Sequence, residues 1–422
     1  MIKRAVTALL GTRIPRPPPG RTPPSQSNPF PEERLDLPTL SGSGYWAGRA
    51  GDVLKDGGVY TVTRKLGWGG YSNVWLASSS EGFSSFAIKV YTAHATQLHR
   101  LGHLHELDAW LRVQATHNQS VAPLLHLVDH FTHLGPLGEH LCLVTYPCAQ
   151  SVSDYLSTAP NRCIPPLVVK RIVTEVLYGL EILHARRIIH TGNLKADNIL
   201  FAADADAVDA AQAQPSTYDP STLNLGGVDY PLMRSAPIRM PWKAQDDPYT
   251  SELYTLRLVD LGQAQLLDGL RVSTTIQPVA MRAPEVLLQA PFGTAVDIWN
   301  LGCLTFELLS GVWLFDPTAN DGVWTAEDDH LNKMAAMTGQ RFPAELLAAG
   351  RQSKIYFNEK GASRIWLQAA PLTDASVPLA NYDVDQLDVC LSFLSACLEL
   401  DPGARASAND LLKHPWLEEA SC

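Results

Sequence analysis

The hydrophobic pattern changes character partway along the chain. Between residues 58 and 90, apolar and polar residues alternate in short runs broken by glycines, which is typical of an antiparallel sheet. After Pro165 and Pro166, apolar residues fall three and four positions apart from Val169 to Leu183, which predicts a long helix with prolines at its start. A strand-rich first part and a helical second part predict an α+β fold of two lobes.

The apolar run 141–145 marks the expected boundary between the lobes. We expect a small β-rich lobe over residues 44–145 and a larger helical lobe over residues 146–201 and 251–422. Residues 202–250 are rich in Ala, Asp, Pro and Ser with little periodicity, which predicts a partly flexible insertion. The cleft between the lobes is the expected ligand site.

The first 43 residues form a basic, proline-rich tail that we expect to be disordered. Residues 1–31 contain five basic residues, many prolines and no acidic residue. An arginine-bearing, acid-free start is also found in mitochondrial transit peptides, but the proline run from Pro15 leaves little room for their helix. A plain extension is therefore favoured over a targeting segment.

Composition narrows the possible partners and environment. The 422 residues are 45% hydrophobic, enough for a large core, and 33 basic against 43 acidic residues give a formal charge of −10. This balance disfavours nonspecific nucleic-acid binding and suits a basic polypeptide partner. Seven cysteines without a CxxC pair favour a reducing compartment. The most apolar stretch, 295–315, carries Asp297 and Glu307, so we expect no transmembrane span.

A glycine-rich run lies between two strand-like segments. It reads Gly67-Trp-Gly-Gly-Tyr-Ser-Asn-Val74, and its glycines would let backbone N–H groups approach phosphate oxygens closely. A tight hairpin that needs glycine for its turn is the alternative. Lys89 follows on the next strand-like run, at the spacing of one hairpin, and can place a positive charge beside a triphosphate.

A lysine in this role needs a carboxylate to hold it. The helix-like stretch 104–112 offers Glu106 and Asp108, and we choose Glu106. The alternative is that both acids are simply solvated on the helix surface.

Two later segments supply possible metal ligands. The run 188–201 contains Lys195 and Asn198, and Asp260 follows much later, before Leu261 and Gly262. Mg²⁺ prefers hard oxygen ligands such as carboxylate and amide oxygens. Asn198 and Asp260 are therefore candidate ligands for a Mg²⁺ ion.

This ordered set of motifs resembles the SR-protein kinases, particularly their fungal members. The likeness covers residues 44–418 and includes Trp68 with Ser72 in the glycine-rich run, Val74–Ala77, His190-Thr191, Leu258–Gln263, Met281–Glu285 and His414–Leu417. It implies a protein-kinase fold and ATP- and Mg²⁺-dependent phosphorylation of serine in basic Arg/Ser-rich proteins, with splicing factors as candidate substrates. It also implies a monomer in the cytoplasm or nucleus, with no direct nucleic-acid or membrane binding.

The resemblance assigns roles to individual residues. Lys89, Glu106, Asn193 and Lys195 would be the catalytic set, Thr145 the gatekeeper and residues 146–149 the hinge. Glu285 and Arg405 would form a buried ion pair, and Asp297 would brace the catalytic loop. The nucleotide would be held by Leu66, Gly67, Trp68, Gly69, Gly70, Ser72, Val74, Ala87, Lys89 and Thr145.

The catalytic loop departs from the family pattern by one residue. The family has six residues between the His and Asn of this loop, whereas His190 and Asn198 enclose seven. Aligned from Asn198, Lys195 takes the place of the catalytic lysine and Asn193 that of the catalytic aspartate. Aligned from His190, Gly192 takes the aspartate's place, so neither alignment supplies a carboxylate.

The missing carboxylate leaves two functions open. Asn193 can orient a substrate hydroxyl but cannot accept its proton, and the nearby Asp197 matches a position that is not the base in the family. Because phosphoryl transfer depends mainly on positioning and charge neutralisation, loss of a general base typically slows it about 10²–10⁴-fold. The chain is then either a kinase of reduced activity or a pseudokinase that binds nucleotide or acts as a scaffold.

Three consecutive acids, Glu327 to Asp329, offer a second possible site. They could line an acidic groove for substrate arginines. They could equally stabilise the start of a helix through its dipole.

Overall fold

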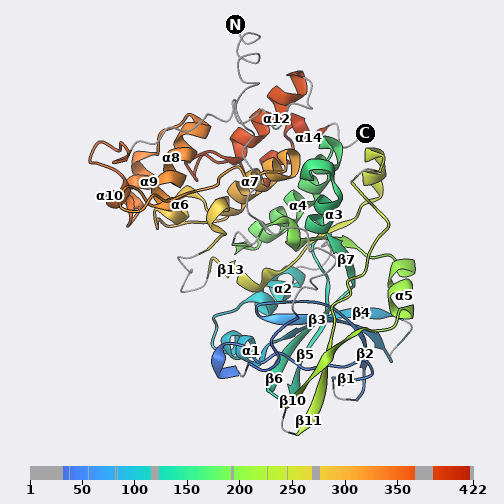
Figure 1. Cartoon of the computed structure of the whole chain (residues 1–422). Coiled ribbons are helices and arrows are strands. Elements are labelled where there is room, and N and C mark those ends of the chain that lie inside the picture. The colour runs from blue at the N-terminus through green and yellow to red at the C-terminus, as the bar shows by residue number, and fades with distance from the viewer. Residues whose placement is uncertain are drawn as a thin grey trace.

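The computed structural model describes residues 32–418, except positions 38, 56, 81, 83, 116–122, 192–193, 226, 245, 269–275 and 366–383. Figure 1 shows two lobes, a lobe built on a β-sheet from the first third of the chain and a lobe built mainly of helices from later residues. The predicted α+β architecture with two lobes is confirmed.

The N-lobe is built on a six-stranded antiparallel sheet in the order β1-β2-β3-β4-β6-β5. Because side chains alternate across a strand, Trp75, Ile88 and Val144 meet in an apolar cluster on one face, while Leu76 and Leu143 join the main core on the other. The strands are β1 Val53–Leu54, β2 Tyr60–Gly69, β3 Ser72–Ser79, β4 Ser85–Tyr91, β5 Leu127–Gly135 and β6 Gly138–Thr145.

Two helices, α1 Ala93–Arg100 and α2 Glu106–Gln114, follow β4 in the N-lobe. Thr92 caps α1, its hydroxyl accepting a hydrogen bond from the Ala95 amide at 3.0 Å. α2 is the helix expected near residues 104–112, and it buries Leu107, Trp110 and Val113 toward the core. This buried stripe fixes which side of α2 faces the cleft.

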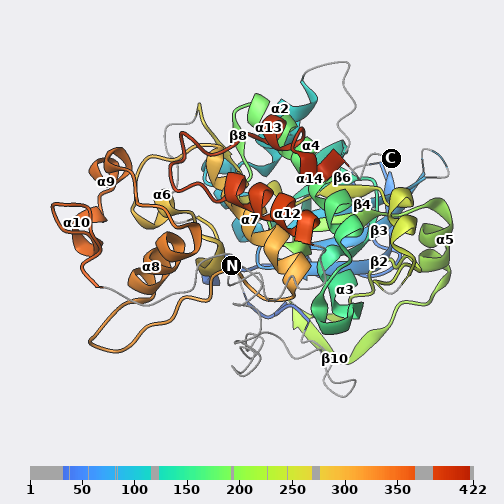
Figure 2. The same ribbon diagram turned by 90° about the horizontal axis from the view of Figure 1, so that it is seen from above.

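The C-lobe is mainly helical, and α4 and α7 run through its core. The apolar positions from Val169 to Leu183 are buried on α4, which confirms the predicted long helix, and α7 packs against both α4 and α12. Helices α8, α9 and α10 gather at one side of the lobe (Figures 1 and 2). The helices are α3 Val152–Thr158, α4 Pro166–Ala185, α6 Pro284–Leu287, α7 Ala295–Ser310, α8 Ala326–Thr338, α9 Ala344–Ala349, α10 Ser353–Tyr356, α12 Val384–Cys397, α13 Ala408–Leu411 and α14 Pro415–Glu418.

Short strands and 3₁₀ turns hold the loops that face the N-lobe. The sheets β12-β9-β7 and β13-β8 place the segment after Ile189 beside the segment after Leu258. The strands are β7 Cys148–Ser151, β8 Ile188–Ile189, β9 Ile199–Ala202, β12 Leu256–Leu258 and β13 Gln265–Leu266. The 3₁₀ turns are η3 Thr39–Ser41, η4 Pro160–Arg162, η5 Ala196–Asn198, η6 Pro248–Leu253, η7 Leu261–Gln263 and η8 Val279–Met281.

The expected disordered tail is corrected in its last part. Residues 1–31 lie outside the described part, but Glu33 and Thr39 of the following stretch form hydrogen bonds with the N-lobe. Glu33 is 3% exposed, and its carboxylate accepts hydrogen bonds from Lys65 and from Asn73. Composition alone predicted a solvated stretch, because Lys65, the buried partner of Glu33, lies on β2 and is distant in the sequence.

Residues 202–250 are more regular than expected from their weak periodicity. They contain α5 Ala205–Ala213 and the hairpin β10 Tyr218–Leu225 with β11 Val228–Met233, which lie beside the N-lobe sheet in Figure 1. Gln212 donates to the Ser85 hydroxyl at 2.7 Å, and Met233 joins the apolar cluster of the sheet. Contacts with the N-lobe, rather than a regular pattern of apolar residues, stabilise α5 and the hairpin.

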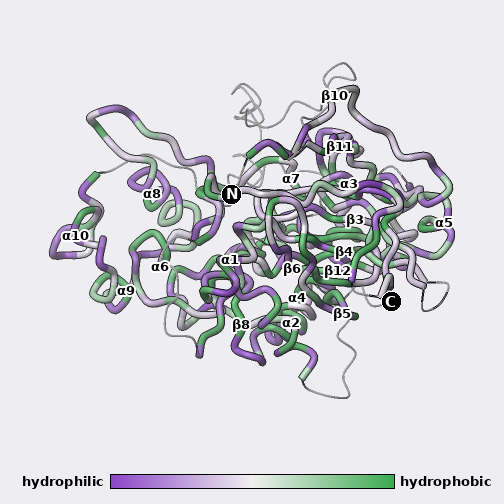
Figure 3. The backbone as a smooth tube through the Cα atoms, turned by 90° about the horizontal axis from the view of Figure 1, so that it is seen from below, coloured by the Kyte–Doolittle hydropathy of each residue, from purple (hydrophilic) through white to green (hydrophobic). Residues whose placement is uncertain are grey.

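Hydropathy and cysteine chemistry fit a packed protein. Figure 3 shows hydrophobic stretches interleaved with hydrophilic ones along the chain. Among the described helices, none combines the length and apolar character that crossing a bilayer needs. The six cysteines of the described part are free thiols.

Candidate active site

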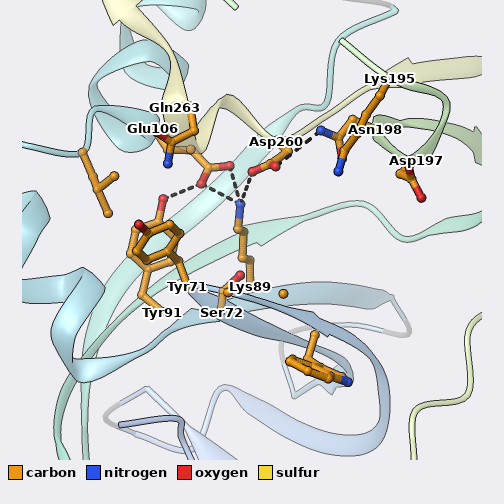
Figure 4. A pocket seen from close by; sticks show the side chains of 15 residues that line it. Tyr71, Ser72, Lys89, Tyr91, Glu106, Lys195, Asp197, Asn198, Asp260 and Gln263 are labelled. Carbon is orange, nitrogen blue, oxygen red and sulfur yellow. Dashed lines mark hydrogen bonds and ion pairs between the residues drawn. The ribbon is translucent and has the colours of Figure 1, made fainter. Parts of the chain in front are cut away.

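A cavity of about 590 Å³ lies between the glycine-rich hairpin of the N-lobe and the loops of the C-lobe (Figure 4). Residues from both lobes line it, so it sits in the cleft where a ligand was expected. Its lining comprises Trp68, Gly69, Gly70, Tyr71 and Ser72 from the hairpin, Lys89, Tyr91, Leu104 and Glu106 from the rest of the N-lobe, and Lys195, Asp197, Asn198, Asp260, Gly262 and Gln263 from the C-lobe.

The glycines of the hairpin leave open space beside the backbone and are not required by the conformation of the turn. β2 and β3 pair up to Gly69 and Ser72, which leaves Gly70 and Tyr71 at the tip. Gly67, Gly69 and Gly70 are absent from the described positions with positive φ, and a Cβ built on each would meet no atom within 4 Å. The backbone conformation therefore does not demand glycine, whereas close approach of a ligand to the backbone would.

Lys89 joins the two lobes through a pair of carboxylates. Its Nζ donates to Oε2 and Oε1 of Glu106 at 2.7 and 2.9 Å, and to Oδ1 of Asp260 at 3.0 Å. Burial alone would lower the pKa of this ammonium, but the negative charges of Asp260 and Glu106 outweigh it and hold the pKa above its ordinary value. The alternative partner, Asp108, is exposed and lies 3.2 Å from His105 instead.

Tyr91 is a cavity residue that the motif search missed. Its buried hydroxyl donates to Oε2 of Glu106, and the Lys89 Nζ lies 5.7 Å from the centre of its ring. Burial and then the adjacent Glu106 carboxylate raise the pKa of Tyr91 well above its ordinary value, which keeps the hydroxyl a donor. The signal was present, because Tyr91 follows Lys89 by two positions on β4 and so shares its face.

Asp260 and Asn198 point toward each other across the floor of the cavity (Figure 4). The Asn198 amide donates to Oδ2 of Asp260 at 3.5 Å. Burial opposes ionisation of Asp260, yet the Lys89 charge lowers the pKa of this carboxyl overall. Asp260 has a φ of 62°, a left-handed conformation uncommon outside glycine that aspartate tolerates. A carboxylate and an amide side by side are oxygen ligands that suit Mg²⁺.

The catalytic loop is braced from the buried helix α7. Oδ2 of Asp297 accepts the His190 backbone N–H at 2.8 Å and lies 3.0 Å from Nε2 of His184. The His190 ring reaches the Val259 carbonyl at 3.1 Å, which links the loop to the residue before Asp260. The expected bracing contact of Asp297 is therefore present.

The expected ion pair of Glu285 and Arg405 is also present. Two nitrogens of Arg405 lie 2.7 and 3.1 Å from the two carboxylate oxygens, and both side chains are fully buried. The pair is remote from the cavity lining, so it supports the fold of the C-lobe.

The remaining predicted nucleotide residues lie on the strands next to this cavity. Val74 pairs in register with Gly67 and with Lys89, and Ala87 pairs with Thr145 across β4 and β6. Lys89 lines the described cavity, whereas Val74, Ala87, Thr145, Leu66 and Gly67 do not. Their strand positions put them near Lys89.

The catalytic-loop residues divide into two groups. Lys195 and Asp197 line the cavity, whereas Asn193 and Gly192 lie outside the described residues. Just before this gap, Thr191 has a φ of 66°, which is strained for a β-branched residue, and its hydroxyl donates to the Gln263 carbonyl. This contact ties the start of the loop to the segment after Asp260.

Comparison with known proteins agrees with this geometry. The model of the protein kinase domain family matches residues 60–211 and 245–417. A serine/threonine-protein kinase SRPK of Physarum polycephalum is 28% identical over 89% of this chain and 89% of its own length. Protein kinase dsk1 of Schizosaccharomyces pombe is 25% identical over 86% of this chain and 81% of its own.

A solved kinase-domain structure shares the fold. Its TM-score is 0.63, with 21% identity over 89% of this chain and 99% of the other. The match of the family model omits residues 212–244, the segment that docks on the N-lobe sheet as a hairpin. The chain thus belongs to the protein kinase domain family, and within it the chain is similar to serine/threonine kinases of the SRPK and dsk1 kind.

Proposed function

We propose that this chain binds MgATP and transfers the γ-phosphoryl group to serine in basic, Arg/Ser-rich proteins. The observation that carries the proposal is the meeting of Lys89, Glu106 and Asp260 in one cavity beneath the glycine-rich hairpin. These groups come from both lobes, so closing the cleft assembles them around one ligand.

The residues present fit ATP and Mg²⁺. The hairpin offers backbone N–H groups to phosphate oxygens, and Lys89, held by Glu106, offers a positive charge to the phosphates. Asn198 and Asp260 would hold Mg²⁺, which supplies neutralisation of the charge on the phosphates. Lys195 belongs to the catalytic loop and lies across the cavity from Lys89. Its positive charge is suited to stabilise the γ-phosphoryl group during transfer.

The acceptor side of the reaction depends on Asn193. An amide at this position would orient the serine hydroxyl but would not take its proton. Positioning and charge neutralisation by the other groups support a reduced rate of transfer, about 10²–10⁴-fold below that of a kinase with the aspartate.

The net negative charge of the chain supports a basic substrate more strongly than the acidic residues 327–329 do. The net charge of −10 favours basic partners, and relatives of this chain include one named SRSF protein kinase 3 in Homo sapiens. In the run 327–329, however, Asp328 forms a capping box with Thr325, while Asp329 binds the Thr318 backbone and lies 2.7 Å from Lys333. The stabilisation of α8 therefore accounts for two of the three acids.

A pseudokinase is the second candidate, favoured by Asn193. We would follow phosphate incorporation into an Arg-Ser peptide by wild type, Asn193→Asp and Lys89→Ala, with MgATP binding measured by thermal shift. Ligand at a hundredfold excess over Kd stabilises the folded state by about 2.7 kcal/mol, which such a shift detects.

The outcomes separate the two candidates. A kinase gives wild-type incorporation above that of Lys89→Ala, and a further rise with Asn193→Asp identifies the missing base. Wild-type incorporation equal to that of Lys89→Ala, with MgATP still bound, would establish the pseudokinase. Because Lys89→Ala leaves the buried Glu106 carboxylate without its cation, Asp260→Asn serves as a second inactive reference.

A further inference from the structure

Tyr45 connects a segment outside the kinase core to the tip of the glycine-rich hairpin. Its hydroxyl donates to the Gly69 carbonyl oxygen at 2.7 Å, and its ring meets that of Trp68 edge to face at 6.2 Å. Tyr45 is 6% exposed, and burial together with the charge of Glu33 raises its pKa to about 12. The hydroxyl therefore remains a donor at neutral pH.

The segment that carries Tyr45 is itself anchored. The Gly44 and Ser43 carbonyls accept the first backbone N–H groups of α1, from Ala93 at 2.8 Å and His94 at 3.2 Å. These N–H groups have no partner within the helix, so the segment caps α1. Tyr45 consequently starts from a fixed backbone, although it precedes the range of the chain that the kinase family model matches.

The hairpin tip is tethered at two carbonyls. Besides the bond from Tyr45 to Gly69, the Thr92 backbone N–H donates to the Tyr71 carbonyl at 2.9 Å. Among the described residues, no atom lies within 4 Å of the positions that a Cβ would take at Gly69 and Gly70, so these two residues have no side-chain packing of their own. The hydrogen bonds to the Gly69 and Tyr71 carbonyls therefore restrain the backbone on both sides of Gly70.

We infer that Tyr45 is a positioning residue for the nucleotide, holding the glycine-rich hairpin over the cavity before the ligand arrives. This inference rests on the proposed binding of MgATP. A glycine-rich hairpin has many backbone conformations to lose when it closes on phosphates. A bond that already restricts Gly69 lowers that loss, so it strengthens binding through preorganisation rather than through contact with the ligand.

The test removes a single oxygen atom. Tyr45→Phe keeps the ring and its contact with Trp68 but loses the hydrogen bond to Gly69. The matched control is Tyr60→Phe, another buried N-lobe tyrosine, whose hydroxyl donates to Asp129 at 3.0 Å away from the cavity. Both variants are compared with wild type for the MgATP dissociation constant, for hydrogen exchange of residues 66–74 without nucleotide, and for thermal midpoint.

We expect Tyr45→Phe to bind MgATP about two- to tenfold more weakly, the range that one hydrogen bond usually contributes. Exchange across residues 66–74 should be faster, and the thermal midpoint should change no more than in Tyr60→Phe. The control should bind MgATP as wild type does. Where peptide phosphorylation is measurable, the KM for ATP should rise more than kcat falls.

Two results would overturn the inference. One is MgATP binding by Tyr45→Phe at least as tight as that of wild type, and the other is unchanged exchange across the hairpin. Failure of wild type itself to bind MgATP would contradict the proposed function instead, and the exchange measurement, made without nucleotide, would still show whether Tyr45 holds the hairpin.

Discussion

Lys89 and Asp260 lie 171 positions apart in the chain, yet Nζ of one is 3.0 Å from Oδ1 of the other. The contact spans the cleft between the lobes, and the same ammonium is held on its other side by Glu106. Asp260 therefore has two competing uses, as a partner of Lys89 and as a ligand for Mg²⁺ beside Asn198.

Asp260→Asn should uncouple ATP binding from Mg²⁺. The amide keeps the shape of the side chain but removes the charge that a divalent cation requires. We expect Mg²⁺ to tighten ATP binding clearly in wild type and by less than about twofold in the variant. Thermal-shift titrations with ATP, with and without Mg²⁺, measure this difference. Asp197→Asn is the matched control on the cavity rim and should retain the Mg²⁺ effect.

Tyr91→Phe should weaken the function of the Lys89–Glu106 pair. The variant keeps the buried ring but leaves Oε2 of Glu106 without the tyrosine hydroxyl, which normally helps to orient the carboxylate toward Lys89. A hydrogen bond to a charged group contributes about 1.5–3 kcal/mol, so we expect phosphorylation, or MgATP affinity if turnover is absent, to fall about tenfold or more. The exposed Tyr178→Phe should behave as wild type, and equal effects of the two changes would contradict the role given to Tyr91.

Stability should fall in mild acid because of two buried histidines. Burial lowers the pKa of His140 to about 4 and that of His330 to about 3. An unfolded histidine takes up its proton near pH 6.5, so the unfolded state binds more protons below that pH. The stability from each neutral histidine is thus complete above about pH 6.5 and declines by about 1.4 kcal/mol per pH unit down to its folded pKa.

His330→Leu isolates one of these contributions. Neither ring nitrogen of His330 has a hydrogen-bond partner among the described residues, and its ring lies 5.0 Å from that of Phe315, so an apolar replacement suits the site. The free energy of unfolding in urea, measured from pH 7 to pH 5, should decline less steeply in this variant. A slope equal to that of wild type, or an equal change on replacing the exposed His103, would refute the assignment.

Arg405→Ala should destabilise the C-lobe strongly. It leaves the fully buried Glu285 carboxylate without its cation, which typically costs about 3–5 kcal/mol. Chemical denaturation should show a lower midpoint, whereas Arg100→Ala, which breaks an exposed pair with Glu139, should leave it near wild type. A small effect at Arg405 would mean that Glu285 finds another partner or becomes protonated.

Local patterns were sufficient for the fold class and for several contacts. Alternation between residues 58 and 90 predicted strands that the sheet contains, and the spacing of apolar residues after Pro166 predicted α4. The choice of Glu106 over Asp108 for Lys89 agrees with the ion pair. These features follow from periodicity and motif spacing, which depend on residues close together in the chain.

Other features depended on contacts that no local pattern reports. Lys65 donates hydrogen bonds to Glu33, 32 positions earlier in the chain, and to the Met233 carbonyl, 168 positions later, and both partners belong to segments that were expected to be flexible. The tether from Tyr45 to Gly69 belongs to the same class. A polar residue can be ordered by a buried partner far along the chain, and the residues next to it in the sequence do not reveal that partner.

The amino-acid sequence by itself determined the two lobes, the glycine-rich run and the kind of side chain available for nucleotide and metal, because each is encoded in short-range order. Only the tertiary structure decided that Asp260 shares Lys89 with Glu106, that Tyr91 joins them, and that the N-terminal segment reaches the hairpin. Such choices depend on burial and on distances across the cleft, and these exist only once both lobes have folded against each other.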